Sequence, residues 1–311
     1  MVITSNRVDK SCNNLCSITN LNLPILNYLI MKKQKWINLA LIALLAGALL
    51  QSCSKEESVP QSTQPTWSVR PDFATLDTRP ADIIAKFQVT EADALPVKLN
   101  ENVSKGAKYA LVVGISDYSG TTNDLQYCDD DAIDWSVRLQ TEGYTVTVLL
   151  DLNATKANIE AEVASLVSKS IAGNEISFVY SGHGSRGNIV TTDLYYINSS
   201  WFKTMFANAT STKMMFSFDA CQIGAMATDL NAAGRVIAVA SDTKKYSYDG
   251  DATMQNGVFT YYQMVGFDQL NYIYVEPDFQ YACDQMKIWA STAHVRVAPS
   301  YVDSYVGDFD L

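Results

Sequence analysis

The regular alternation of short apolar runs with amphipathic stretches after Lys108 constrains the fold more than any other feature of this sequence. Each apolar run has the length and continuous hydrophobicity of a strand that is buried on both faces of a sheet. The predicted strands are residues 109–115, 143–150, 175–181, 213–218 and 235–240. The pattern between and after them predicts helices at residues 131–140, 155–170, 200–207, 257–267 and 278–292. Strands that alternate with helices predict an α/β fold, a mostly parallel β-sheet with helices on both faces.

The composition supports a globular chain and excludes several classes of function. Of the 311 residues, 48% are hydrophobic, which is enough apolar material for one sizeable core or two small ones. The net charge is −10, and the acidic excess lies after residue 52. Phosphate binding needs clustered Lys and Arg, so we expect no nucleic acid partner. Only two histidines are present, so a His-rich metal site is excluded, and we expect neither a metal nor a cofactor.

Residues 31–53 have the anatomy of a bacterial export signal. A short basic stretch after Met31 precedes a mostly apolar run, 37–50, which is shorter than the roughly 20 residues that span a membrane. The run ends in Gln-Ser-Cys53, which resembles a lipoprotein signal whose cysteine becomes the lipidated N-terminus. We therefore expect residues 1–52 to be a signal segment, with residues 1–30 a wrongly assigned extension. The alternative is a single membrane-anchoring helix, and either reading places the rest of the chain outside the cytoplasm.

The remaining chain divides by composition into three parts. Residues 53–66 are rich in Ser, Thr, Pro and Gln, and we expect them to form a flexible tether that follows the lipid anchor. Residues 67–107 lack clear periodicity, and we expect them to be a leader that lies across the main domain, with a helix near 80–87. Residues 108–311 form the main domain. The predicted location is the bacterial cell envelope, anchored to a membrane and facing the periplasm or the exterior.

Cysteine usage argues against a disulfide scaffold. Removal of the signal would leave Cys128, Cys221 and Cys283 besides the anchored Cys53. Three is an odd number, so at least one of these thiols stays free even in an oxidising compartment.

Reactive side chains follow two of the predicted strands. His183 and Gly184 come directly after the third strand, and Cys221 comes after the fourth. If these strands are neighbours in a parallel sheet, His183 and Cys221 lie side by side at one rim. An imidazole can take the proton of a thiol and return it to a leaving amine, while the backbone N–H groups of Gly184 and Cys221 hold the oxyanion. The alternative is an inert, buried cysteine and a capping histidine.

These two motifs resemble those of the caspase-like cysteine peptidases, and within them the metacaspases and their bacterial relatives. The resemblance covers 108–267 and rests on Tyr-Ser-Gly-His183-Gly, followed 38 residues later by Asp-Ala-Cys221. The residues after Cys221, Gln222-Ile223-Gly224, depart from both the caspase and the metacaspase patterns. The resemblance implies a caspase-like fold and a Cys–His dyad, and neither departure touches the dyad.

The resemblance also implies a primary specificity pocket lined by Cys128, Asp131, Ser181 and Asp219. Two carboxylates in a partly desolvated pocket favour a cation, and an arginine fork matches them. Asp131 alone could instead stabilise a helix N-terminus. By the same resemblance, 246–249 forms part of the substrate groove, although we expect Asp249 and Asp251 to be solvated turn residues. The family's calcium-binding acids are not matched, because 185–198 contains only one acid, Asp193.

The prediction is a lipid-anchored cysteine endopeptidase that acts on proteins or peptides with Arg or Lys before the cleaved bond. The alternatives are an inactive surface-binding lipoprotein with the same fold and a related peptidase of different specificity, for example for Asn. A tethered segment has a high effective concentration at its own groove, so we expect the leader to occlude the site partly. We also expect cleavage near 98–105 or 244–245 to accompany full activity.

Overall fold

A six-stranded sheet forms the centre of the molecule, whose computed structural model describes residues 66–311. The strand order is β12-β10-β9-β5-β3-β4, and every neighbouring pair is parallel except β10 and β12. The strands are β3 (Lys108–Gly114), β4 (Thr145–Leu150), β5 (Glu175–Ser181), β9 (Lys213–Asp219), β10 (Arg235–Val239) and β12 (Ser300–Asp303). All five predicted strands are therefore confirmed, and the antiparallel edge strand β12 was not predicted.

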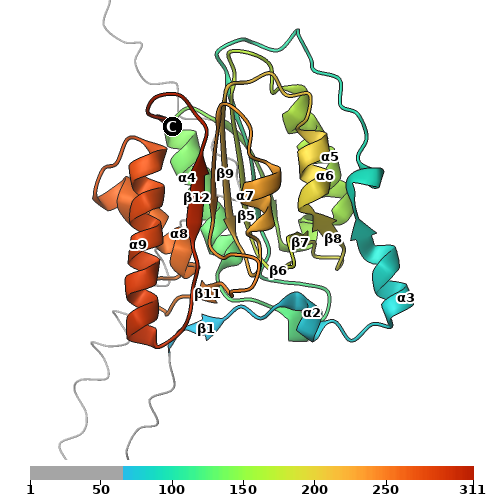
Figure 1. The fold of residues 1–311 in the computed structure, drawn as a ribbon, viewed down its shortest axis with the longest axis vertical. Helices are drawn as coiled ribbons and strands as arrows, with labels where there is room; N and C mark the ends of the chain where they lie inside the picture. Colours follow the sequence, from blue (N-terminus) through green and yellow to red (C-terminus); the bar gives the residue numbers. More distant parts are fainter. Residues whose placement is uncertain (1–65) are drawn as a thin grey trace, which may run out of the picture. The chain divides into compact units, whose positions relative to one another are not determined.

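Helices cover both faces of this sheet (Figure 1). One core cluster packs residues of α5, α6 and α7 against the sheet, and a second cluster packs α4, α8 and α9 against the opposite face. The helices are α4 (Cys128–Thr141), α5 (Lys156–Ser168), α6 (Ser199–Met205), α7 (Ala225–Asp229), α8 (Val258–Met264) and α9 (Val275–Ala293). Single turns of 3₁₀-helix occur at Ala85–Phe87, Glu91–Asp93, Thr121–Asn123 and Asp151–Asn153, and α8 continues as a π-helical turn, Val265–Gln269. The predicted α/β architecture is confirmed.

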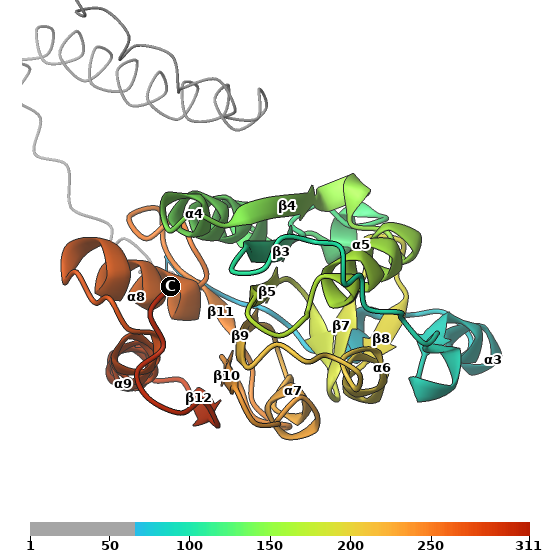
Figure 2. The ribbon, with the colours of Figure 1, turned by 90° about the horizontal axis from the view of Figure 1, so that it is seen from above.

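A small second sheet follows the end of β5. It contains four strands in the order β2-β8-β7-β6, which are β2 (Gln88–Val89), β8 (Tyr196–Asn198), β7 (Asn188–Val190) and β6 (Gly184–Ser185). Strand β6 begins directly after His183, so this sheet fixes the backbone on one side of the predicted catalytic histidine. Viewed along the strands of the main sheet, β7 and β8 lie to one side of β5, next to α6 (Figure 2).

The leader belongs to the same compact unit as the main sheet. Strand β1 (Ser68–Val69) pairs antiparallel with β11 (Tyr248–Asp249), near the carboxyl ends of the central strands (Figure 1). Helices α2 (Phe73–Leu76) and α3 (Ala81–Ile84) follow, and α3 with the next 3₁₀ turn matches the predicted helix near 80–87.

Several sequence predictions fall outside the described residues. The signal segment 1–52, the lipidation site Cys53 and the tether up to residue 65 all belong to this group. Within residues 66–311, no helix is long and apolar enough to cross a membrane.

Candidate active site

The sheet topology brings His183 and Cys221 to the same rim. Strands β5 and β9 are parallel neighbours, and the last residue of each, Ser181 and Asp219, are paired in register. His183 and Cys221 each follow two residues later and are fully buried. Parallel strands end at one edge of a sheet, so residues 183 and 221 both lie at this rim.

The hydrogen bonding of His183 identifies its basic nitrogen. Nε2 lies 2.7 Å from the Asn123 carbonyl oxygen and therefore donates its proton there. Nδ1 is buried and has no hydrogen bond of normal geometry within the described residues, although the Pro71 carbonyl lies close enough to the ring to affect its pKa. Burial lowers the pKa of His183 to about 4, although the Asn123 and Pro71 carbonyls oppose this shift. The imidazole is thus neutral, which is the state that a general base requires.

The thiol of Cys221 contacts the leader. Sγ lies 2.7 Å from the carbonyl oxygen of Arg70, and the N–H of Ser247 donates to Sγ at 3.1 Å. Burial raises the pKa of Cys221 to about 12, against the opposing effects of the Ser247 N–H and the Arg70 charge. The thiol is therefore protonated in this arrangement, whereas the nucleophile of a cysteine peptidase is the thiolate.

Gly184 lies against the backbone of Cys221. A side-chain carbon at position 184 would lie 2.2 Å from the Cys221 carbonyl oxygen and 3.1 Å from its nitrogen, so only glycine allows this approach. The two backbones whose N–H groups were predicted to hold the oxyanion are therefore adjacent.

The predicted pocket residues surround one cation, the guanidinium of Arg70. Nη2 lies 3.0 Å from Asp131 Oδ2, while Nη1 lies 3.1 Å from Asp219 Oδ1 and donates to Ser181 Oγ at 3.1 Å. Cys128 is buried close enough to interact electrostatically with Arg70. Burial alone would lower the pKa of Arg70, but the carboxylates of Asp219, Asp249 and Asp131 raise it well above its usual value.

Comparison with known proteins agrees with the observed fold. Residues 107–268, half of the chain, match the model of the caspase domain family. The chain belongs to this family. The crystal structure of protein GSU0716 from Geobacter sulfurreducens shares the fold at a TM-score of 0.51 and 13% sequence identity, covering 66% of this chain and 97% of that chain. No curated protein matches the chain significantly.

Asp249 corrects one prediction within the caspase domain. We expected a solvated turn residue, but Asp249 is buried and its Oδ1 lies 2.8 Å from Arg70 Nε. The cause is the pairing of β11 with β1, which places Asp249 against the leader. Asp251 does match the expectation, because its carboxylate accepts from the backbone of its own turn.

Two further residues of the pocket were not predicted to line it. The N–H of Gly257 donates to Asp131 Oδ1 at 2.8 Å, and a side-chain carbon there would lie 2.4 Å from the Arg70 guanidinium. Thr260 holds Asp219 through its N–H and its hydroxyl, each at 3.1 Å. The sequence signal was the start of helix α8, whose first N–H groups point at the pocket carboxylates.

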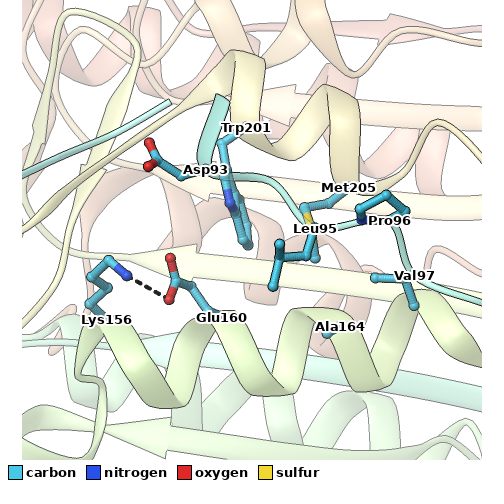
Figure 3. Close-up of a pocket in the computed structure, with 9 residues that line it drawn as sticks. All are labelled: Asp93, Leu95, Pro96, Val97, Lys156, Glu160, Ala164, Trp201 and Met205. Carbon is cyan, nitrogen blue, oxygen red and sulfur yellow. Dashed lines mark hydrogen bonds and ion pairs between the residues drawn. The ribbon is translucent and has the colours of Figure 1, made fainter. Parts of the chain in front are cut away.

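A separate cavity of about 520 Å³ lies between the later part of the leader and helices α5 and α6 (Figure 3). Its walls are Asp93, Leu95, Pro96, Val97, Lys156, Glu160, Ala164, Trp201 and Met205. None of the dyad or pocket residues lines it. Within residues 66–311, no group of three or more His, Cys, Asp or Glu side chains is arranged to hold a metal ion.

Proposed function

We propose that this chain is a cysteine endopeptidase that cleaves after arginine, and less well after lysine. The proposal rests on one observation: Arg70 fills an acidic pocket while its own carbonyl oxygen lies 2.7 Å from Cys221 Sγ. A substrate arginine in this pocket would present its following peptide bond to the thiol. The neighbouring backbone supports the same register, because the Arg70 N–H donates to the Ser247 carbonyl at 3.0 Å.

The proposed reaction uses the residues at this rim. His183 Nδ1 takes the proton of the Cys221 thiol, and the thiolate attacks the carbonyl carbon of the substrate arginine. The Gly184 and Cys221 N–H groups hold the resulting oxyanion. When the C–N bond breaks, the imidazolium returns its proton to the leaving amine and a thioester remains. Water, deprotonated by His183, hydrolyses the thioester and regenerates the thiol.

Two alternatives predict different results with the same peptides. An inactive surface-binding protein would hydrolyse none of them, and a peptidase specific for Asn would gain little from several carboxylates. The test is a panel of fluorogenic peptides that differ only at the residue before the cut. The proposal expects Arg to be the best residue, and faster cleavage after Asp or Asn would contradict it.

The pocket should distinguish Arg from Lys through Asp249. Only arginine carries an Nε–H, from which the Asp249 carboxylate accepts a hydrogen bond, whereas lysine offers a single terminal ammonium. In an Arg70→Ala background, Asp249→Asn should lower kcat/KM about 10-fold for Arg peptides, as for a hydrogen bond to a charged group. The loss for Lys peptides should be smaller.

Asp251→Asn is the matched control for this prediction. It removes a carboxylate two residues away that accepts hydrogen bonds within its own turn. The kcat/KM values for Arg and for Lys peptides should both stay unchanged. An equal loss for Arg and Lys peptides in Asp249→Asn would refute the proposed role of Asp249.

We further propose that the leader keeps the enzyme latent, because Arg70 occupies the pocket that a substrate needs. The leader adds a strand to β11 by main-chain pairing, a common mode of peptide recognition. Its next bond is Arg70–Pro71, a tertiary amide whose nitrogen bears a ring carbon instead of hydrogen. This ring would hinder delivery of a proton to the leaving nitrogen, so the leader would resist cleavage by its own site. Cleavage near 98–105 or 244–245 stays a prediction.

We propose that the chain acts at a bacterial membrane surface through a lipid on Cys53. The support is the signal anatomy of 31–53. Cys53→Ala should remove incorporation of a clickable fatty acid and leave the signal unprocessed in cells. Cys12→Ala, a change before the signal, should leave labelling intact. Labelling that persists in Cys53→Ala would disprove the anchor.

A further inference from the structure

The residues before Arg70 differ sharply in what they contact. Val69 is 45% exposed and Ser68 is also exposed, so neither side chain is held by the cleft. Trp67 is partly buried and packs edge-on against two rings, with centroid distances of 5.6 Å to Tyr248 and 5.6 Å to Trp289. Of the three residues that precede Arg70, only Trp67 therefore has a side-chain site.

This site is a pair of rings presented by two elements. Tyr248 lies on β11 opposite Val69 in the ladder, and Trp67 is its diagonal neighbour on the same face. Trp289 lies near the end of α9, and its ring centroid is 5.4 Å from that of Tyr248. Because α9 lies beyond residues 107–268, half of this ring pair comes from outside the matched caspase domain.

We propose that Tyr248 and Trp289 form a subsite for an aromatic side chain three residues before the substrate arginine. This inference rests on the proposed function and names its substrate class: peptides of the pattern aromatic-X-X-Arg. Edge-to-face packing of aromatic rings adds to the free energy of burying their apolar surface. Ser68 and Val69 are exposed, which indicates that the two substrate residues between the aromatic residue and the arginine contribute little to specificity.

The experiment uses the full chain with Trp67→Ala and Arg70→Ala, which empties both positions without removing the leader. Fluorogenic peptides X-Ser-Val-Arg are compared with Trp, Phe, Leu, Ala or Asp at X. We expect kcat/KM to be about 10-fold higher for Trp than for Ala, with Phe close to Trp and Leu lower. Adding Trp289→Ala should abolish the preference for Trp over Ala at X, so that the two peptides are cleaved at similar rates.

Ile288→Ala is the matched control, because Ile288 is the adjacent residue of α9 and is 59% exposed. It should change neither peptide. Equal rates for Trp and Ala at X, or an equal loss for both peptides in Trp289→Ala, would overturn the aromatic subsite. Failure to cleave any Arg peptide would instead overturn the proposed function, so the two failures are distinguishable.

Discussion

Full-chain protein with Arg70→Ala should hydrolyse an arginyl peptide on the order of 10²-fold faster than the unaltered chain. Arg70 is fully buried among three carboxylates, and truncation of one partner of such a cluster costs about 2–5 kcal/mol of binding free energy. The substitution weakens binding of the leader to the pocket. The carboxylates that Arg70 no longer covers can then be hydrated or bind the cation of a substrate. The measurement is kcat/KM on a fluorogenic Arg peptide.

Two companion variants separate this effect from a general loss of structure. Arg79→Ala removes another leader arginine, which contacts Asp77, the Leu194 carbonyl and the Phe87 ring but none of the pocket carboxylates, and it should leave the chain latent. Pro71→Ala keeps Arg70 in the pocket but converts the following bond to a secondary amide. It should cut itself after Arg70, as seen by intact mass, unless Cys221 is also replaced. Equal activity of the Arg70→Ala and unaltered chains would disprove latency.

Replacement of Cys221 or His183 by alanine in the Arg70→Ala chain should reduce activity on the order of 10³-fold or more, as is usual for residues that act as one catalytic unit. Cys221→Ala removes the nucleophile, and His183→Ala removes the only imidazole at this rim. The double variant should be no worse than either single variant, because each alone disables the same step.

Cys283→Ala is the control for the thiol. Cys283 is also free and buried, but it lies on α9 in the second core cluster, away from the rim. It should retain activity. More than a few per cent of activity in Cys221→Ala would refute the dyad.

The central strands were predictable because a strand that is covered on both faces of a parallel sheet is a continuous run of apolar residues. The predicted strand 175–181 coincides with β5, since every residue after Glu175 in it is buried. Strand β12 could not be found in this way, because its residues are half exposed and it pairs only along one edge. Strands β6, β7 and β8 have two or three residues each, too few to show a period.

The site was predictable from the sequence only in part. The neighbouring ends of β5 and β9 follow from topology, so the placement of residues 183 and 221 at one rim of the sheet was predictable, whereas the dyad itself stays a prediction. Asp249 and Arg70 were different, because their burial depends on contacts with distant segments, including each other, 179 residues apart in the chain. Nothing local distinguishes Arg70 from the other basic residues of the leader, and nothing local distinguishes Asp249 from Asp251. Burial created by long-range pairing carries no periodic signal.

We propose that Arg70 occupies the place of a substrate arginine, with its carbonyl oxygen at the Sγ of a nucleophilic Cys221. This proposal is tested most directly by labelling with two irreversible peptidyl ketone probes that differ only in carrying Arg or Asp next to the reactive group, read by intact mass and peptide mapping. We expect the Arg probe to modify Cys221 rapidly in Arg70→Ala and at least about 10-fold more slowly in the unaltered chain. The Asp probe should label neither chain. Equal labelling of both chains by the Arg probe, or preferential labelling by the Asp probe, would contradict the proposal.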